Sequence, residues 1–237
     1  MTRFAKPIFL MSDTNEPKHI LTLFDRALGQ LRENLAHMAR LTQESFDNAA
    51  RALASRDDDL CNRVIAEDEE VDQLEKTIDA EGIQILTKYT PMAHDFRRVF
   101  STMKAATDLE RITDQSVSIA RRAKRLLHAA ELPETRMLEP IFGMANALLR
   151  DGIHAFTKED ASLGLELKAR DKQLDARHHE FIERITRRME DDPANAQSYL
   201  DLVLIARFIE RVGDHAVNLG EDSVFSSSAV DVRHSQT

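Results

Sequence analysis

The chain has 237 residues but only 7 glycines and 6 prolines. These make up about 5% of the chain, where roughly 12% is usual, so the many tight turns of a sheet protein are excluded and an all-helical protein is indicated. Lysine and arginine number 32 against 41 aspartates and glutamates, which gives a formal net charge of −9. Duplex nucleic acid is therefore a poor partner, because its phosphates would meet a surface of like charge.

A single cysteine, Cys61, excludes an internal disulfide and any cysteine-based zinc site, and it fits a reducing cytoplasm. We expect it to be a small buried residue, because no base for a nucleophilic thiol is identifiable. No apolar run approaches the ~20 residues that span a membrane, and Ile8–Met11 is too short for a secretory core. These features predict a soluble, cytoplasmic protein, with Met11 as an alternative start to Met1.

Prolines and acidic residues mark the expected helix starts along the chain. Four of the six prolines suit a first helical turn, where the missing N–H has no helical partner to lose. Asp57–Asp59 and Glu159–Asp160 provide negative charge at two further starts. Pro140 either kinks the fourth helix or marks its true beginning. We expect six helices, at residues 17–54, 57–87, 91–128, 134–157, 160–190 and 193–223.

An internal repeat relates the two halves of the chain. Apolar residues recur at every third and fourth position of the expected helices, as in an antiparallel bundle. Shifting the second helix by 103 residues places Leu60 on Leu163, and shifting the third by 100 places Ile112 on Val212. We therefore predict an all-α fold of two tandem antiparallel three-helix bundles related by duplication. The expected divisions are a flexible N-terminus (1–16), a first bundle (17–131), a second bundle (132–225) and a disordered tail (226–237).

Repeated carboxylates offer the most specific chemistry in the sequence. Four acidic pairs, each with members four residues apart on one helix face, occupy equivalent positions in the two halves. One such pair alone would most simply be a solvated acidic surface. On a helical wheel, however, Glu110 lies between Val99 and Val117 on one side and Met103 on the other, so the acids border the apolar stripe. The pairs are Asp68/Asp72 and Glu110/Asp114 in the first half, and Asp171/Asp175 and Glu210/Asp214 in the second.

Four carboxylates that converge from two helices repel one another and are poorly solvated, so they need arginine partners or bound cations. We expect cations, because Arg111 and Arg211 lie about 100° further round and would more easily serve a neighbour's surface. Oxygen ligands suit Mg²⁺, Mn²⁺, Ca²⁺ or iron, with zinc as a further candidate, and bridging carboxylates could hold several ions. His178 either adds a nitrogen ligand beside Asp175 or is an ordinary core histidine, whereas His215 points away from that site.

Three segments, Pro91–Arg98, Asp108–Asp114 and Ile209–Asn218, resemble the PhoU family of phosphate-signalling proteins, and the similarity extends over residues 17–223. That family has a repeated E(D)xxxD motif on paired helices, which carries multinuclear metal clusters in some members. The resemblance therefore implies metal ions at the eight carboxylates. Thr113 departs from the family's usual glycine, which the second half keeps as Gly213. The bulkier threonine is expected to narrow the approach to the first site.

The resemblance implies regulation rather than catalysis. It implies a cytoplasmic adapter between the phosphate-sensing histidine kinase and the ATPase subunit of the phosphate ABC transporter, which represses the phosphate-starvation response when phosphate is plentiful. We also expect a homodimer that reaches the membrane only through its partners. The sequence has no glycine-rich phosphate loop and no Walker motif. Two alternatives stay open: a metal-free helical adapter, and a carboxylate-bridged di-iron enzyme, whose Glu-x-x-His motif occurs only at Glu16–His19.

Overall fold

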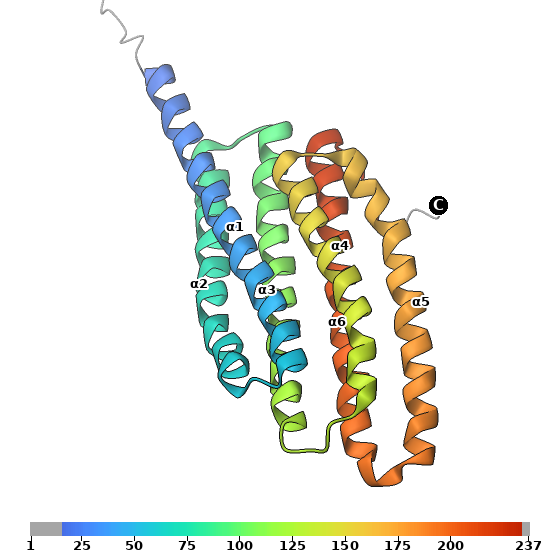
Figure 1. The fold of residues 1–237 in the computed structure, drawn as a ribbon. Helices are drawn as coiled ribbons and strands as arrows, with labels where there is room; N and C mark the ends of the chain where they lie inside the picture. Colours follow the sequence, from blue (N-terminus) through green and yellow to red (C-terminus); the bar gives the residue numbers. More distant parts are fainter. Residues whose placement is uncertain (1–15, 234–237) are drawn as a thin grey trace, which may run out of the picture.

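The computed structural model describes the backbone of residues 16–233 and the side chains of residues 21–233. This part of the chain contains six α-helices, two short 3₁₀ helices and no strand (Figure 1), which confirms the all-helical prediction. The N-terminal segment 1–15 lies outside the described residues. The elements are α1 (Glu16–Ser55), α2 (Asp58–Tyr89), α3 (His94–Leu126), η1 (Pro133–Met137), α4 (Leu138–Lys158), α5 (Ala161–Asp191), η2 (Pro193–Asn195) and α6 (Ala196–Ser228).

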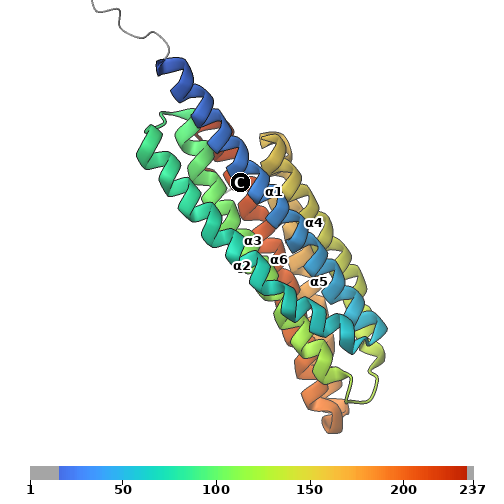
Figure 2. The ribbon, with the colours of Figure 1, turned by 90° about the vertical axis from the view of Figure 1, so that its left-hand side faces the viewer.

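The helices form two three-helix bundles that lie side by side (Figures 1 and 2). Helices α1, α2 and α3 pack on one another, as do α4, α5 and α6, and the bundles join along α3 and α6, with a smaller contact between α1 and α4. Buried apolar side chains of both bundles form one continuous core. No helix in the described part of the chain combines the length and the apolar character that crossing a membrane requires.

The two bundles repeat the same turn between their first two helices. Arg56 and Glu159 both have a left-handed backbone, with φ of 53° and 55°. The next residue then caps the following helix: the side chain of Asp57 accepts from the N–H of Leu60, and that of Asp160 accepts from the N–H of Leu163. The duplicated acidic starts of the sequence are thus N-caps, and the 103-residue offset holds in the backbone as well.

Three helices begin later than their prolines suggested. Helix α3 starts at His94 rather than at residue 91, because Ala93 has a positive φ of 49° that interrupts the turn. Pro133 and Pro193 start 3₁₀ helices, and the α-helices follow them. Pro140 is the third residue of α4. Its position therefore costs no helical hydrogen bond, because the first four N–H groups of a helix have no partner within it.

The expected boundary of the tail at residue 226 is three residues too early. Helix α6 runs to Ser228, and Ser226 is buried. The hydroxyls of Ser227 and Ser228 donate to the carbonyls of Ser223 and Val224, four residues back. These bonds satisfy the hydroxyls within the last helical turn, so the polar sequence does not end the helix.

Charged side chains cross the seam between α3 and α6, which run antiparallel. The buried carboxylate of Asp201 on α6 accepts from Arg122 of α3 at 2.8 Å and from Arg125. At the other end, Lys104 of α3 pairs with the buried Asp222 of α6. These carboxylates are compensated by their cations, because a buried unpaired charge would be costly. The pairs fix how the two bundles face one another.

Glycines of the second bundle bring neighbouring helices against α6 at backbone distance. A Cβ on Gly152 would lie 2.6 Å from the carbonyl oxygen of Ala216, and one on Gly164 would lie 2.5 Å from that of Gly220. Neither α4 nor α5 could keep its position against α6 if a larger residue replaced its glycine. The first bundle has Cys61 at the place of Gly164, so α2 cannot approach α3 as closely there.

Candidate metal centres

The structure brings the second acidic quartet together between α5 and α6. Asp171 is close enough to Asp175, Asp214 and Glu210 to feel all three charges. Burial first, and then these three carboxylates, raise the pKa of Asp171 to about 7. The pKa values of Glu210 and Asp214 are also raised, mainly by burial. The quartet therefore holds protons more readily than ordinary surface carboxylates do.

The first quartet lies between α2 and α3. Burial raises the pKa of Glu110 to about 7, with Asp114 and Asp72 adding to the effect and Arg111 opposing it. The pKa of Asp68 is raised by burial and by the charges of Asp72 and Asp114. All eight predicted carboxylates thus lie in two groups, one on each equivalent pair of helices.

Arginines screen both quartets, and this differs from the sequence-based expectation. Arg111 was expected to serve a neighbour's surface. Instead it folds back along α3, with its Nε 3.3 Å from Glu110 Oε2 and its Nη1 3.6 Å from Asp114 Oδ2. A wheel places only the Cα–Cβ direction, whereas this long side chain reaches either neighbour. In the second site, Arg207 pairs with Glu210, three residues further along α6.

Several buried acceptors of the two sites have no hydrogen-bond donor. In the second site they are Asp171 Oδ1, Glu210 Oε2 and His178 Nε2. In the first site, Glu110 Oε2 makes no hydrogen bond but lies 3.3 Å from Arg111 Nε. Buried polar atoms are normally satisfied, and each orphan costs free energy that a proton or a cation would recover. The donor set of oxygens with one nitrogen fits hard and borderline divalent cations.

The side chains are not arranged as a finished coordination shell. Across residues 21–233, no three His, Cys, Asp or Glu side chains form a group that could hold one ion. Mutual repulsion and the pairing with Arg111 and Arg207 explain why the carboxylates stay apart. Holding an ion would therefore require rotamer changes at these acids. The Glu16 and His19 side chains of the di-iron alternative lie outside the described ones.

The two sites differ at a pair of packed residues. A Cβ on Gly213 would lie 2.5 Å from Leu174 Cδ2 and 2.6 Å from Asp171 Oδ1. In the first half, Thr113 and Val71 take the places of Gly213 and Leu174. The larger residue has thus moved from α5 in one copy to α3 in the other. The hydroxyl of Thr113 donates to Leu109 O at 3.2 Å, within its own helix.

Sequence reasoning missed Glu75, which contributes to the raised pKa of Glu110. At the 103-residue offset, Glu75 corresponds to His178, so the repeat itself could have identified it. The first site therefore has an extra carboxylate where the second has an imidazole. Burial and Arg207 lower the pKa of His178. His215, expected to point away, lies across the seam, with Nδ1 2.8 Å from Asp108 Oδ1.

The fold and these acids define a class of protein, a six-helix chain made of two copies of one unit with an acidic quartet in each. The PhoU domain family model matches residues 35–123 and 138–223, which are the two copies. The chain belongs to the PhoU family.

Curated relatives cover nearly the whole chain. The phosphate-specific transport system accessory protein PhoU homolog of Pseudomonas putida is 33% identical over 91% of this chain and 85% of its own length. That of Pseudomonas aeruginosa is 31% identical over 91% and 90%. Among solved structures, PhoU from Pseudomonas aeruginosa has a TM-score of 0.85 at 30% identity, covering 87% of this chain and 100% of that one. The phosphate transport system regulatory protein PhoU from Streptococcus pneumoniae has a TM-score of 0.80 at 25% identity, covering 88% and 99%.

Proposed function

We propose that the protein is a cytoplasmic regulator of phosphate homeostasis. It acts as an adapter between the ATPase subunit of the phosphate ABC transporter and the phosphate-sensing histidine kinase, and it represses the starvation response when phosphate is plentiful. The observation that carries this proposal is the match of both helical units to relatives named as accessory proteins of phosphate transport. The role is one of binding rather than catalysis, and the expected homodimer belongs to the same proposal.

A deletion strain tests the regulatory role. In phosphate-rich medium, loss of the gene should raise expression of a phosphate-starvation reporter, and a plasmid copy should restore repression. Pull-down from the same cells with the tagged protein should recover the kinase and the transporter ATPase. Unchanged reporter expression in a strain that contains both partners would contradict the adapter role.

We propose further that each acidic quartet binds one or more metal ions, with iron, manganese, magnesium and zinc as the candidates. Support comes from the unpartnered buried oxygens and from the raised pKa values of Glu110 and Asp171. A bound cation would neutralise the repelling charges. Asp68, Asp72, Glu110 and Asp114 would hold it in the first site, and Asp171, Asp175, Glu210 and Asp214 in the second.

The double substitution Glu210→Ala/Asp214→Ala tests the second centre. It should lower the metal content of the purified protein by one site's share and leave the first site's share. A metal that binds only the folded state stabilises it by mass action, by about 2.7 kcal/mol at one hundred times the dissociation constant. A chelator should therefore lower the melting temperature of the wild type more than that of the variant.

The same pair of melting curves separates the metal-free alternatives. If the acids are only solvated or paired with arginine, chelation shifts neither protein. If the quartet is vacant and repulsive, the variant is more stable than the wild type even without metal, because like charges have been removed. A wild type that contains no metal and does not respond to chelator would refute the metal centres, while the adapter proposal would be unaffected.

A further inference from the structure

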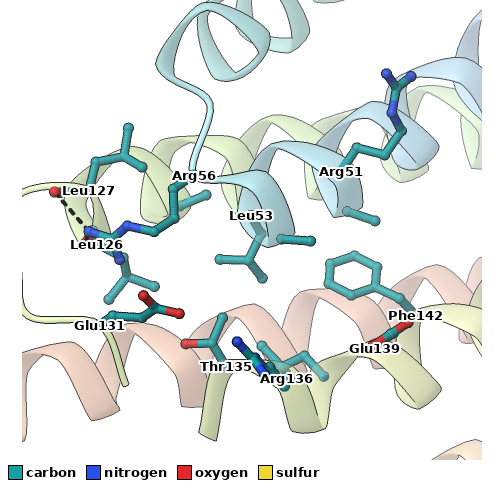
Figure 3. Close-up of a pocket in the computed structure, with 14 residues that line it drawn as sticks. Arg51, Leu53, Arg56, Leu126, Leu127, Glu131, Thr135, Arg136, Glu139 and Phe142 are labelled. Carbon is teal, nitrogen blue, oxygen red and sulfur yellow. Dashed lines mark hydrogen bonds between the residues drawn. The ribbon is translucent and has the colours of Figure 1, made fainter. Parts of the chain in front are cut away.

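A pocket of about 520 Å³ opens at the junction of the two bundles. The ends of α1 and α3 line it on one side, and η1 with the start of α4 lines it on the other (Figure 3). Its volume lies within the range of about 300–1,000 Å³ that is usual for small-molecule sites. None of the eight predicted metal-ligating carboxylates lines the pocket.

The pocket has an apolar interior and a charged rim. Leu53 and Phe142 face it from α1 and α4, and the ring of Phe142 is held back by packing on Phe46, with centroids 5.5 Å apart. Arg56 lies at one end, where it donates to the carbonyls of Leu126 and Leu127 at 3.0 and 2.9 Å. These bonds fix the end of α3 and keep that wall of the pocket in place.

Two more kinds of charge stand at the rim. Arg136 of η1 is an exposed lining residue, and Figure 3 shows it beside Thr135. Glu131 and Glu139 are also exposed lining residues. With Arg51 and Arg56, the lining has three arginines and two glutamates, so this end is net positive in a chain whose net charge is −9.

The duplicate of this pocket is closed. The corresponding space in the second half, at the end of α4, has only about 10 Å³. Its lining includes Ile153, Phe156 and Thr157, and the 103-residue offset relates these to Ala50, Leu53 and Ala54 of the open copy. At each of these three positions the open copy has the smaller side chain, and all three lie on the α1 wall of the pocket. The two copies therefore differ on both walls: the open copy has smaller residues on α1, and on the facing wall it has Phe142 where the closed copy has Ala39.

We propose that this pocket binds a small amphiphilic anion, with a branched or aromatic apolar body between Leu53 and Phe142 and its anionic group at Arg136. The open copy has Ala50 and Leu53 where the closed copy has an isoleucine and a phenylalanine, and Phe142 lies opposite, so a branched or aromatic body matches the apolar lining. Burying an apolar body there gains about 25 cal/mol for each Å² removed from water. The anionic group gains a charge-assisted hydrogen bond from the guanidinium.

Binding of 8-anilinonaphthalene-1-sulfonate, an aromatic molecule with one sulfonate, tests the proposal on the full chain. Its fluorescence should rise with one saturable site per chain. The triple variant A50I/L53F/A54T, which gives the α1 wall the three larger residues of the closed copy, should weaken binding by at least about tenfold, equal to about 1.4 kcal/mol. A176I, which adds the same isoleucine at an exposed position of α5, should leave the affinity unchanged.

The anionic group is tested with R136Q and a neutral probe of similar shape, N-phenyl-1-naphthylamine. The substitution should weaken binding of the sulfonate probe by about fivefold or more. It should leave the affinity of the neutral probe unchanged, because only the sulfonate pairs with the guanidinium. Helical circular dichroism confirms that each variant is folded, and A50I replaces the triple variant if that one is not. No probe binding up to ~1 mM would overturn the proposal. So would an unchanged affinity in a folded closed-pocket variant or in R136Q.

Discussion

The two halves of the molecule share their helices and caps but differ in how tightly the other helices pack on their last helix. In the second half, α4 and α5 meet α6 at glycines, and in the first half larger residues stand at the equivalent places. Duplication has thus preserved the backbone plan while the contact distances diverged. The residues that differ are Gly152, Gly164, Gly213 and Gly220 in the second half, and Ala49, Cys61, Thr113 and Ala120 in the first.

This difference has a direct effect on the acidic quartets. Where Gly213 lets α5 come close, Asp171 is pressed against α6 with an unpartnered buried oxygen. Asp68, its counterpart in the first half, faces a helix that has Thr113 instead. Asp171 is therefore the more strained of these two equivalent carboxylates without a cation. The comparison teaches that a single glycine, Gly213, can change the environment of a carboxylate that is identical in the two halves.

The largest effect is expected from Gly164→Ala. The new Cβ would meet the carbonyl of Gly220 at 2.5 Å, and backbone cannot move aside cheaply. We expect a loss of about 3 kcal/mol, the upper end for overpacking. Gly29→Ala in α1 is the matched control, because nothing lies within 4 Å of its Cβ position. It should stabilise the protein by about 0.5–1 kcal/mol, as alanine does in a helix interior. Urea unfolding of both variants measures whether the free energy of unfolding changes in opposite directions. A change in the same direction for both would contradict the comparison.

A smaller effect is expected from exchanging the packed pair between the halves. Gly213→Thr alone should cost about 2 kcal/mol, because the side chain would overlap Leu174 and Asp171. Adding Leu174→Val, which copies Val71 of the first half, should recover about 1 kcal/mol of this loss. A double-mutant cycle by thermal unfolding measures that coupling. Additive costs would show that Thr113 and Val71 do not compensate one another in the way inferred here.

The smallest effect concerns pH. In metal-free protein, the pKa of Asp171 is raised to about 7 from an ordinary value of 3.8. Its ionisation therefore opposes folding: stability is full below about pH 4 and falls as the pH rises to about 7. Asp171→Asn removes this penalty, so the variant should gain on the wild type across that interval and remain more stable above it. After allowance for solvent screening we expect about 1 kcal/mol.

Asp68→Asn is the control from the first half. Its pKa is raised in the same direction, so the gain should have the same sign, but none of its atoms is an unpartnered buried one. We therefore expect a smaller gain, measured by denaturant unfolding at pH 4, 6 and 8 with chelator present. A larger gain in stability from Asp68→Asn than from Asp171→Asn would contradict the order of strain proposed for these two carboxylates.

Much of the fold could be predicted from the sequence, because its signals are local and periodic. The stripes of apolar residues, the caps at Asp57 and Asp160 and the repeat offsets all depend on residues within a few turns of one another. The starts of α3 and α6 could not be placed, since a proline restricts its own φ but does not oblige the chain to continue as an α-helix.

The grouping of the eight acids was also readable from helical periodicity and duplication. The pairing of Arg111 and Arg207 was not, because long side chains choose between several neighbours according to local packing. The open pocket was equally hidden, as it depends on Ala50, Leu53 and Ala54 being small where three partner elements meet. Such features come from the sum of contacts across helices that are distant in sequence.

The charges along the α3–α6 seam also determine which halves can pack on one another. At the 100-residue offset, Asp222 corresponds to Arg122 and Asp201 to Ser101. Two first halves packed in the same antiparallel way would therefore set Lys104 against Arg122, and two second halves would set Asp201 against Asp222. In each of these pairings of identical halves, like charges would meet across the seam. The seam charges therefore favour the packing of a first half on a second half over the packing of two identical halves.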